Sequence, residues 1–208
     1  MKTLKVILLS ALLSSVALSQ PIKNRAPEGK GGDSKLNVKK NRTDSPNSTS
    51  VKEWNLSDIV NFEEPQEWTS GDDRSDLEKE GEGTPIQVTG FLLQAKQEGK
   101  ESYNCSLSGV ANTDLHLAIA SKSTTPEAQS IIAEITPRVK LQHHGWTKVK
   151  LNAIVSNEMT VRVTRYLLLG TQHINNPFPR ASNWEIHPIT ELEVEQNGKW
   201  VSLDDFTS

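Results

Sequence analysis

The chain has 208 residues and a formal net charge of −3, and 24% of its residues are charged. This near balance of charge excludes the strongly basic class of nucleic-acid-binding proteins. Cys105 is the only cysteine, so no disulfide can form within the chain. In an oxidising compartment the fold must then be held together by burial of apolar side chains.

The first 19 residues have the pattern of a secretory signal peptide. Lys2 and Lys5 precede an apolar run over 6–18, and the small residue Ser19 stands where a signal peptidase cuts. The run is shorter than the roughly 20 apolar residues of a membrane-spanning helix. We therefore predict a signal peptide at 1–19 and a secreted or periplasmic mature chain without an integral membrane segment.

The next part of the chain, 20–83, is polar, with basic residues up to Ser50 and acidic residues from Val51 onward. Regularly spaced apolar residues are sparse there, so the segment lacks the burial that would offset its ordering entropy. An apolar island at 54–62 is predicted to be a transient helix or a strap against the following domain. We predict a largely disordered tail that is dispensable for folding.

From residue 84 to 208, short apolar runs rich in β-branched residues are separated by Gly, Pro, Asn and Ser, as in a small β-rich domain. Gly90 in the first run indicates a bulge or a sharp bend. The element order predicts a mainly β, OB-like Greek-key barrel with one helix between the third and fourth strands. A two-layer α+β sheet is the alternative. The expected elements are strands at 86–95, 114–120, 130–137, 160–170 and 184–195, a helix at 141–156 with an apolar stripe of Trp146, Val149 and Ala153, and a hairpin turn at Asn197 and Gly198.

Several segments of this domain together resemble one family. They are DLH following Cys105, EITPR, a VRV strand followed by His173, and RASNWEIHP at 180–188. Over 85–194 the chain is similar to bacterial extracytoplasmic OB-like domain proteins that carry an R-A-x-x-W-E-I-H-P segment. The resemblance implies the barrel and the compartment but no reaction, because the group has no established activity. Where the group has an acidic pair before the histidine, this chain has GTQ.

Strand alternation brings metal-ligand residue types together on two faces. Asp114 and His116 share one face of the DLH strand, and Glu185 and His187 share one face of the WEIHP strand. If the two strands are neighbours, the four side chains could hold a divalent cation such as zinc or manganese. The alternatives are sheet histidines tied to nearby carboxylates or carbonyls, and general acid–base use.

A second group of residues suits ligand binding. Arg180 lies on a loop rich in Pro and Asn just before Trp184, so its guanidinium could grip a carboxylate or phosphate while the indole stacks on the ligand. In the alternative, Arg180 pairs with Glu185 or Glu134 and Trp184 plugs one end of the barrel. The predicted ligand-binding residues are Arg180, Trp184, Glu185, His187 and Arg138.

No catalytic residues are predicted, because the chain lacks a nucleophile elbow, a phosphate-cradling loop and a His-Glu-x-x-His motif. The favoured function is a secreted or periplasmic binding module for a polar ligand or protein partner. A sugar, peptide or protein is favoured over nucleic acid, because eleven basic residues from Thr84 onward are balanced by twelve acidic ones. The alternatives are an envelope structural protein and a metal-dependent hydrolase. The hydrolase would use Asp114, His116, Glu185 and His187, and that metal is the only cofactor considered.

Overall fold

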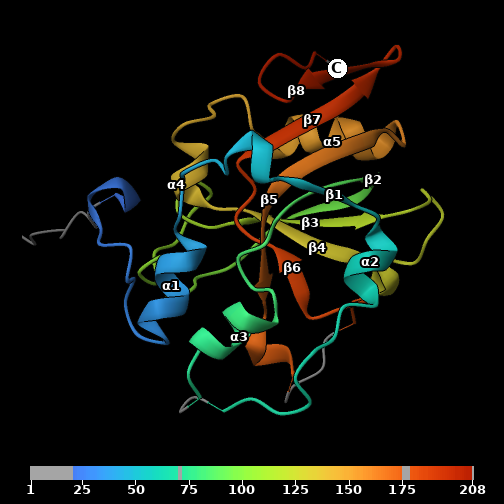
Figure 1. Cartoon of the computed structure of the whole chain (residues 1–208). Helices are drawn as coiled ribbons and strands as arrows, with labels where there is room; N and C mark the ends of the chain where they lie inside the picture. The colour runs from blue at the N-terminus through green and yellow to red at the C-terminus, as the bar shows by residue number, and fades with distance from the viewer. Residues whose placement is uncertain (1–20, 70–71, 175–178, 208) are drawn as a thin grey trace, which may run out of the picture.

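The computed structural model describes residues 21–69, 72–174 and 179–207 (Figure 1), and the predicted signal peptide lies outside them. The strands are β1 Lys52–Trp54, β2 Pro85–Gln97, β3 Leu115–Ala120, β4 Ile131–Ile135, β5 Thr160–Leu169, β6 Trp184–Ile186, β7 Glu191–Gln196 and β8 Lys199–Ser202. The helices are α1 Ser34–Lys40, α2 Leu56–Val60, α3 Ser75–Glu80, α4 Pro137–Lys140 and α5 Lys148–Ser156. Short 3-10 turns lie at Ile22–Asn24, Ser48–Ser50, Glu127–Gln129 and Thr171–His173.

Five strands close a barrel in the order β2-β3-β4-β6-β5, with β5 pairing back onto β2. All neighbours are antiparallel except β4 and β6, which run parallel. With α4 and α5 connecting the third barrel strand to the fourth, this is the order of an OB-type Greek-key barrel. The predicted fold class is therefore confirmed. Outside the barrel, β1 pairs with β2, and the β7–β8 hairpin extends from β5.

The core follows from strand alternation. Leu115, Leu117 and Ile119 of β3 point inward and are at most 2% exposed. Gly90 of β2 is needed for close packing, because an added Cβ there would lie 2.8 Å from the carbonyl oxygen of Ala120. The bulge expected in this strand lies just beyond, between Leu92 and Gln94.

The helix between the third and fourth barrel strands differs from the prediction. Within the expected helix at 141–156 only α5 is helical, from Lys148 to Ser156, and a separate short helix, α4, lies just before the predicted start. The Thr147 side chain caps α5 by accepting a hydrogen bond from the backbone N–H of Lys150 at 3.3 Å. Leu151 and Ile154 are buried, whereas Val149 is 79% exposed. Of the predicted stripe, Trp146 is buried in the core, but Val149 is not, because the late start of α5 turns Leu151 and Ile154 toward the barrel instead.

The strand predicted at 184–195 is two strands. The break follows His187, because Pro188 has no N–H with which to continue a ladder. β6 pairs with β4 and with one end of β5, whereas β7 pairs with the other end of β5. The predicted hairpin turn is confirmed at Asn197 and Gly198, which have φ values of 55° and 74°.

The N-terminal segment corrects the prediction of a disordered tail at 20–83. Its described residues carry β1, α1, α2 and α3, and α1 and α2 lie on opposite sides of the barrel (Figure 1). Ile22, Leu56, Ile59 and Leu77 are at most 8% exposed. The island at 54–62 is the strap that sequence analysis offered as one alternative. Apolar residues are few in this segment, but these four are buried, whereas Val38 and Val60 are 38% and 43% exposed.

Charged side chains tie the same segment to the barrel. Arg74 and Glu82 form an ion pair whose side chains are 2% and 1% exposed. Arg74 Nη2 also donates a hydrogen bond to the carbonyl oxygen of Leu169 at 2.8 Å, and Lys39 Nζ lies 2.6 Å from Glu82 Oε2. The acidic and basic blocks that made the segment look disordered therefore supply its anchors.

Candidate functional site

The WEIHP motif lies on β6 and just beyond it, where side chains alternate between two faces. Trp184 and Ile186 point into the core and are 0% exposed, as the period of two predicts. Glu185 and His187 point the other way, yet they are only 2% and 1% exposed. The outer face of β6 is therefore as deeply buried as the inner face.

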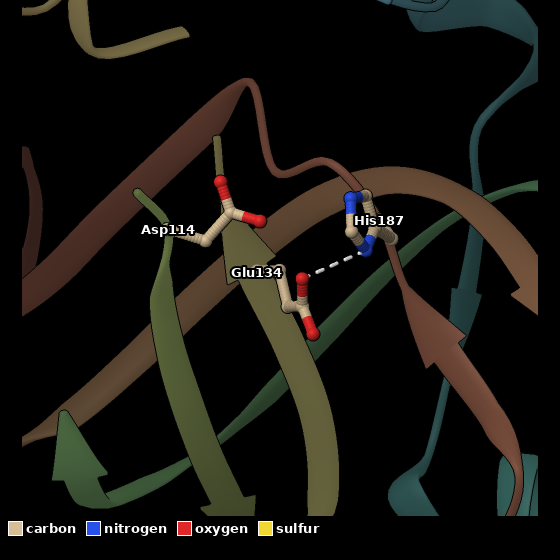
Figure 2. A group of neighbouring side chains, drawn as sticks. All are labelled: Asp114, Glu134 and His187. Atoms are coloured by element: carbon tan, nitrogen blue, oxygen red, sulfur yellow. Dashed lines mark ion pairs between the residues drawn. The ribbon is translucent and has the colours of Figure 1, made fainter. Parts of the chain in front are cut away.

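The strand order corrects the predicted metal group. β4 lies between β3 and β6, so the DLH and WEIHP strands are not neighbours. Glu134 of β4 occupies the position between them, with Oε2 3.1 Å from His187 Nδ1 (Figure 2). Its Oε1 lies 3.6 Å from Nδ1 of His116. Among the described residues, the group that could hold a metal is Asp114, Glu134 and His187, whose donor atoms lie within 4.8 Å of one another. His116 and Glu185 are outside that group.

Glu134 is missing from the sequence-predicted set, although the sequence carries a signal for it. Ile131, Ala133 and Ile135 of the same strand face the core, so Glu134 must point outward. A lone carboxylate in an otherwise apolar central strand needs neutralising partners when it is buried. A search for such isolated charges would have found Glu134.

Asp114 lies immediately before β3 and is completely buried. The Tyr103 hydroxyl is hydrogen-bonded to Asp114 Oδ2 and also lies 3.0 Å from Glu134 Oε2. Asn104 Nδ2 donates a hydrogen bond to Asp114 Oδ1 at 2.9 Å. Burial raises the pKa of Asp114 well above its usual range, and the carboxylates of Glu134 and Glu101 raise it further. Within this cluster, Asp114 is therefore the carboxyl group that most readily keeps a proton.

Glu185 is held by two cations. Lys40 Nζ, which α1 supplies from its last residue, lies 3.4 Å from Oε1, and Arg180 Nη1 lies 3.4 Å from Oε2. Burial alone would raise the pKa of Glu185, but Lys40, His187 and Arg180 outweigh it and hold this pKa well below its usual range. Glu134 follows the same pattern, because His187 and Lys40 lower its pKa against the effect of burial. Both carboxylates are therefore ionised in neutral solution.

Four of the five predicted ligand-binding side chains are almost completely buried, and Arg138 is partly exposed. The alternative weighed for Arg180 holds, because it pairs with Glu185 and its side chain is 4% exposed. Trp184 plugs the barrel and donates a hydrogen bond from Nε1 to the carbonyl oxygen of Glu63 at 2.9 Å. Arg138 binds the N-terminal segment, because its guanidinium donates hydrogen bonds to the carbonyl oxygens of Arg25 at 2.8 Å and Ala26 at 3.0 Å.

The N-terminal segment covers the face that OB-type barrels commonly use for ligands. In OB-type barrels that face consists of the second and third barrel strands and of the loops that follow the first and fourth strands. In this chain the two strands are β3 and β4, and the two loops follow β2 and β5. The backbone N–H of Lys30 donates to the carbonyl oxygen of Ser102 at 2.8 Å, and Asn41 Nδ2 donates to that of Tyr103 at 2.8 Å. The N-terminal segment therefore forms a cover over a group of buried polar side chains, which we call the buried polar cluster. Its members are Lys40, Tyr103, Asn104, Asp114, Glu134, Arg180, Glu185 and His187.

An open groove lies elsewhere on the barrel and has a volume of about 910 Å³. Its floor includes Gln87 and Thr89 of β2 and Arg162 of β5. Trp200 of β8 carries the Arg162 guanidinium over its ring at 4.6 Å from the ring centroid. The opposite wall comes from β1 and α2. The lining residues are Glu53, Trp54, Asn55, Leu56, Ser57, Val60, Asn61, Gln87, Thr89, Ala120, Ser121, Gln129, Ile131, Arg162 and Trp200.

Fold and site together define an OB-like barrel whose usual ligand face is closed by its own N-terminal segment and which has a separate polar groove. Comparisons of the chain with protein-family models, with curated proteins and with solved structures found no match. Among the helices of the described residues, none has the length and apolarity to cross a membrane.

Proposed function

We propose that this domain is a non-catalytic binding module that takes an extended polar ligand, a glycan chain, in the groove between α2 and the outer faces of β2 and β5. The groove volume of about 910 Å³ lies at the upper end of the range for small-molecule sites. The observation that carries the proposal is this open, polar groove on a barrel whose usual ligand face is covered.

The side chains of the groove suit a sugar better than a nucleic acid. Amide and hydroxyl groups predominate among the polar lining residues, and the indoles of Trp54 and Trp200 offer apolar surface for a sugar ring. Arg162, the one cation among the described residues of the lining, is paired with Glu193 at 2.7 Å. A phosphate backbone would require a stripe of basic residues along the groove, which this lining does not supply.

Binding is also favoured over the metal-dependent hydrolysis suggested by Asp114, His116, Glu185 and His187. Hydrolysis requires a substrate to reach the reactive groups, and three of these four side chains are at most 2% exposed. The strand adjacency on which that hypothesis rested is absent.

The proposed site of action is outside the cytoplasm. This rests on the signal-like pattern of residues 1–19, with Lys2 and Lys5 before an apolar run. Fractionation of cells that express the full chain should recover it from the periplasm or the medium without its first residues. Retention of an uncleaved chain in the cytoplasm would contradict the proposal.

The binding test uses linear tetrasaccharides of glucose, of N-acetylglucosamine and of galacturonic acid, titrated calorimetrically into the purified chain. The informative variant is Thr89→Arg, because Thr89 is an exposed residue on the groove floor and a long side chain there would fill the groove. We expect at least a tenfold loss of affinity. Thr207→Arg is the matched control, because Thr207 is exposed and outside the lining.

Two outcomes would overturn the proposal. One is that none of these tetrasaccharides binds, and the other is that a binding tetrasaccharide loses no affinity in Thr89→Arg. Titrations with single-stranded DNA and with a mixed peptide library distinguish the alternatives, because tight binding of either would replace the glycan with another class of ligand.

A further inference from the structure

We propose that Asp114, Glu134 and His187 form a binding site for one divalent transition-metal ion, zinc or manganese, beneath the N-terminal cover. The site is independent of the groove, so the two proposals can fail separately.

The geometry is the first argument. Figure 2 shows the three side chains converging from the start of β3, from β4 and from the residue after β6. One donor atom from each lies within 4.8 Å of the others. An imidazole with two carboxylates suits zinc and manganese, which bind these donors at about 2.0–2.2 Å. Small side-chain rotations would bring the three donors around one ion.

Buried donor atoms without hydrogen bonds are the second argument. His187 is 1% exposed, and its Nε2 has no hydrogen-bond partner among the described residues, whereas its Nδ1 faces the carboxylates of Glu134 and Glu185 as ion pairs. Asn104 is 0% exposed, and its Oδ1 also has no hydrogen-bond partner within the described chain, while its Nδ2 donates to Asp114. Buried polar groups nearly always have partners, so these atoms point to a ligand that satisfies them.

The same arrangement indicates how a metal ion could enter the site. Lys40 and Arg180 pair with Glu185, which is outside the group of Asp114, Glu134 and His187, so they need not leave when an ion binds there. Because the three ligands are buried, the ion enters either through local opening of the cover or during folding. The experiment therefore offers metal in both ways.

The test uses the full chain, first freed of metal with a chelator. Zn²⁺ and Mn²⁺ are titrated separately into native protein, and each is also present while the chain refolds from urea. We expect one bound equivalent and a higher melting temperature. Asp114→Asn and Glu134→Gln, which keep side-chain shape, should each lower the affinity at least tenfold. His143→Gln is the control, because His143 pairs with Asp204 near the surface.

A spectroscopic readout protects the test from variants that fail to fold. Zn²⁺ binding to the wild-type chain should shift the ring nitrogen resonances of His187 and leave those of His143 unchanged. The proposal is overturned if neither the native nor the refolded chain takes up a stoichiometric ion. It is equally overturned if the bound ion leaves the His187 resonances in place, or if His143→Gln abolishes uptake while Asp114→Asn retains it.

Discussion

The cluster beneath α1 and the groove beside α2 are both polar, but they differ in their access to water. In the cluster, Glu185 and His187 are at most 2% exposed and each charge has a specific partner. In the groove, Thr89 is exposed, and the Arg162–Glu193 pair keeps about a quarter of each side chain accessible. Loss of one polar partner should therefore cost more folding free energy in the cluster than in the groove, because a buried charge without its partner has no water to solvate it.

The same contrast explains why the most distinctive sequence motif, WEIHP, is buried. WEIHP joins two apolar core residues to two titratable ones on and just beyond a short strand, and the N-terminal segment covers the face with the titratable side chains. The groove has no motif of its own, because its walls come from stretches far apart in sequence, such as Trp54 and Trp200. The following predictions test this contrast, from the largest expected effect to the smallest.

Removal of the cover should have the largest effect. A chain that starts at Thr84 loses Ile22, Leu56, Ile59 and Leu77, each worth about 1.5–3 kcal/mol of burial. Together they approach the roughly 5–15 kcal/mol that stabilises a typical domain, so we expect no cooperative thermal melt by circular dichroism. A chain that starts at Pro21 is the control. A sharp melt of the shorter chain would show that the barrel stands without its cover.

Trp184→Ala should be the most damaging single change. The indole is completely buried, packs edge-on against Phe62 at 5.2 Å between ring centroids, and donates to the Glu63 carbonyl oxygen. Loss of this side chain should lower the free energy of unfolding by about 3–5 kcal/mol in urea denaturation. The partly exposed Trp200 of the groove is the matched comparison. An equal loss in Trp200→Ala would mean that the groove wall belongs to the core.

The sequence predicted the barrel because strand alternation is local, and it predicted the two faces of β6 for the same reason. It could not predict that Glu134 lies between Asp114 and His187, because that depends on which strands pair. Nor could it predict the cover, because composition alone gives no information on where Ile59 or Leu77 finds a partner surface. For the same reason it could not predict that this segment would bury Arg180 and its neighbours.

Lys40→Met tests the buried cluster directly. It removes the cation that lies 3.4 Å from Glu185, and loss of one partner of a buried ion pair costs about 3–5 kcal/mol. Because Arg180 still neutralises part of the charge, we expect the lower end of that range in urea denaturation at neutral pH. Lys35→Met is the control on the same helix, because the Lys35 side chain is 73% exposed.

The same variant should change acid unfolding. The pKa of Glu185 is held well below its usual range against the effect of burial, foremost by Lys40. Its stabilising contribution is therefore present above its unfolded pKa of about 4.3 and is lost as the pH falls through the lower folded value. Without Lys40, burial raises the folded pKa, so the acid unfolding midpoint, followed by tryptophan fluorescence, should move to higher pH. An unchanged midpoint would mean that Lys40 does not set the ionisation of Glu185.

Glu193→Gln in the groove should have the smallest effect. Glu193 pairs with Arg162 across β7 and β5 at 2.7 Å, a shorter contact than the 3.4 Å between Lys40 and Glu185, but the side chains are 28% and 25% exposed. Water already solvates both charges, so the loss should be about 0.5 kcal/mol at low salt and should vanish near 1 M salt. Lys40→Met should retain its cost in the same salt, because buried pairs are poorly screened. A salt-independent loss above about 2 kcal/mol in Glu193→Gln would show that this wall of the groove is as desolvated as the cluster, and the groove could then not hold a hydrated sugar in the proposed way.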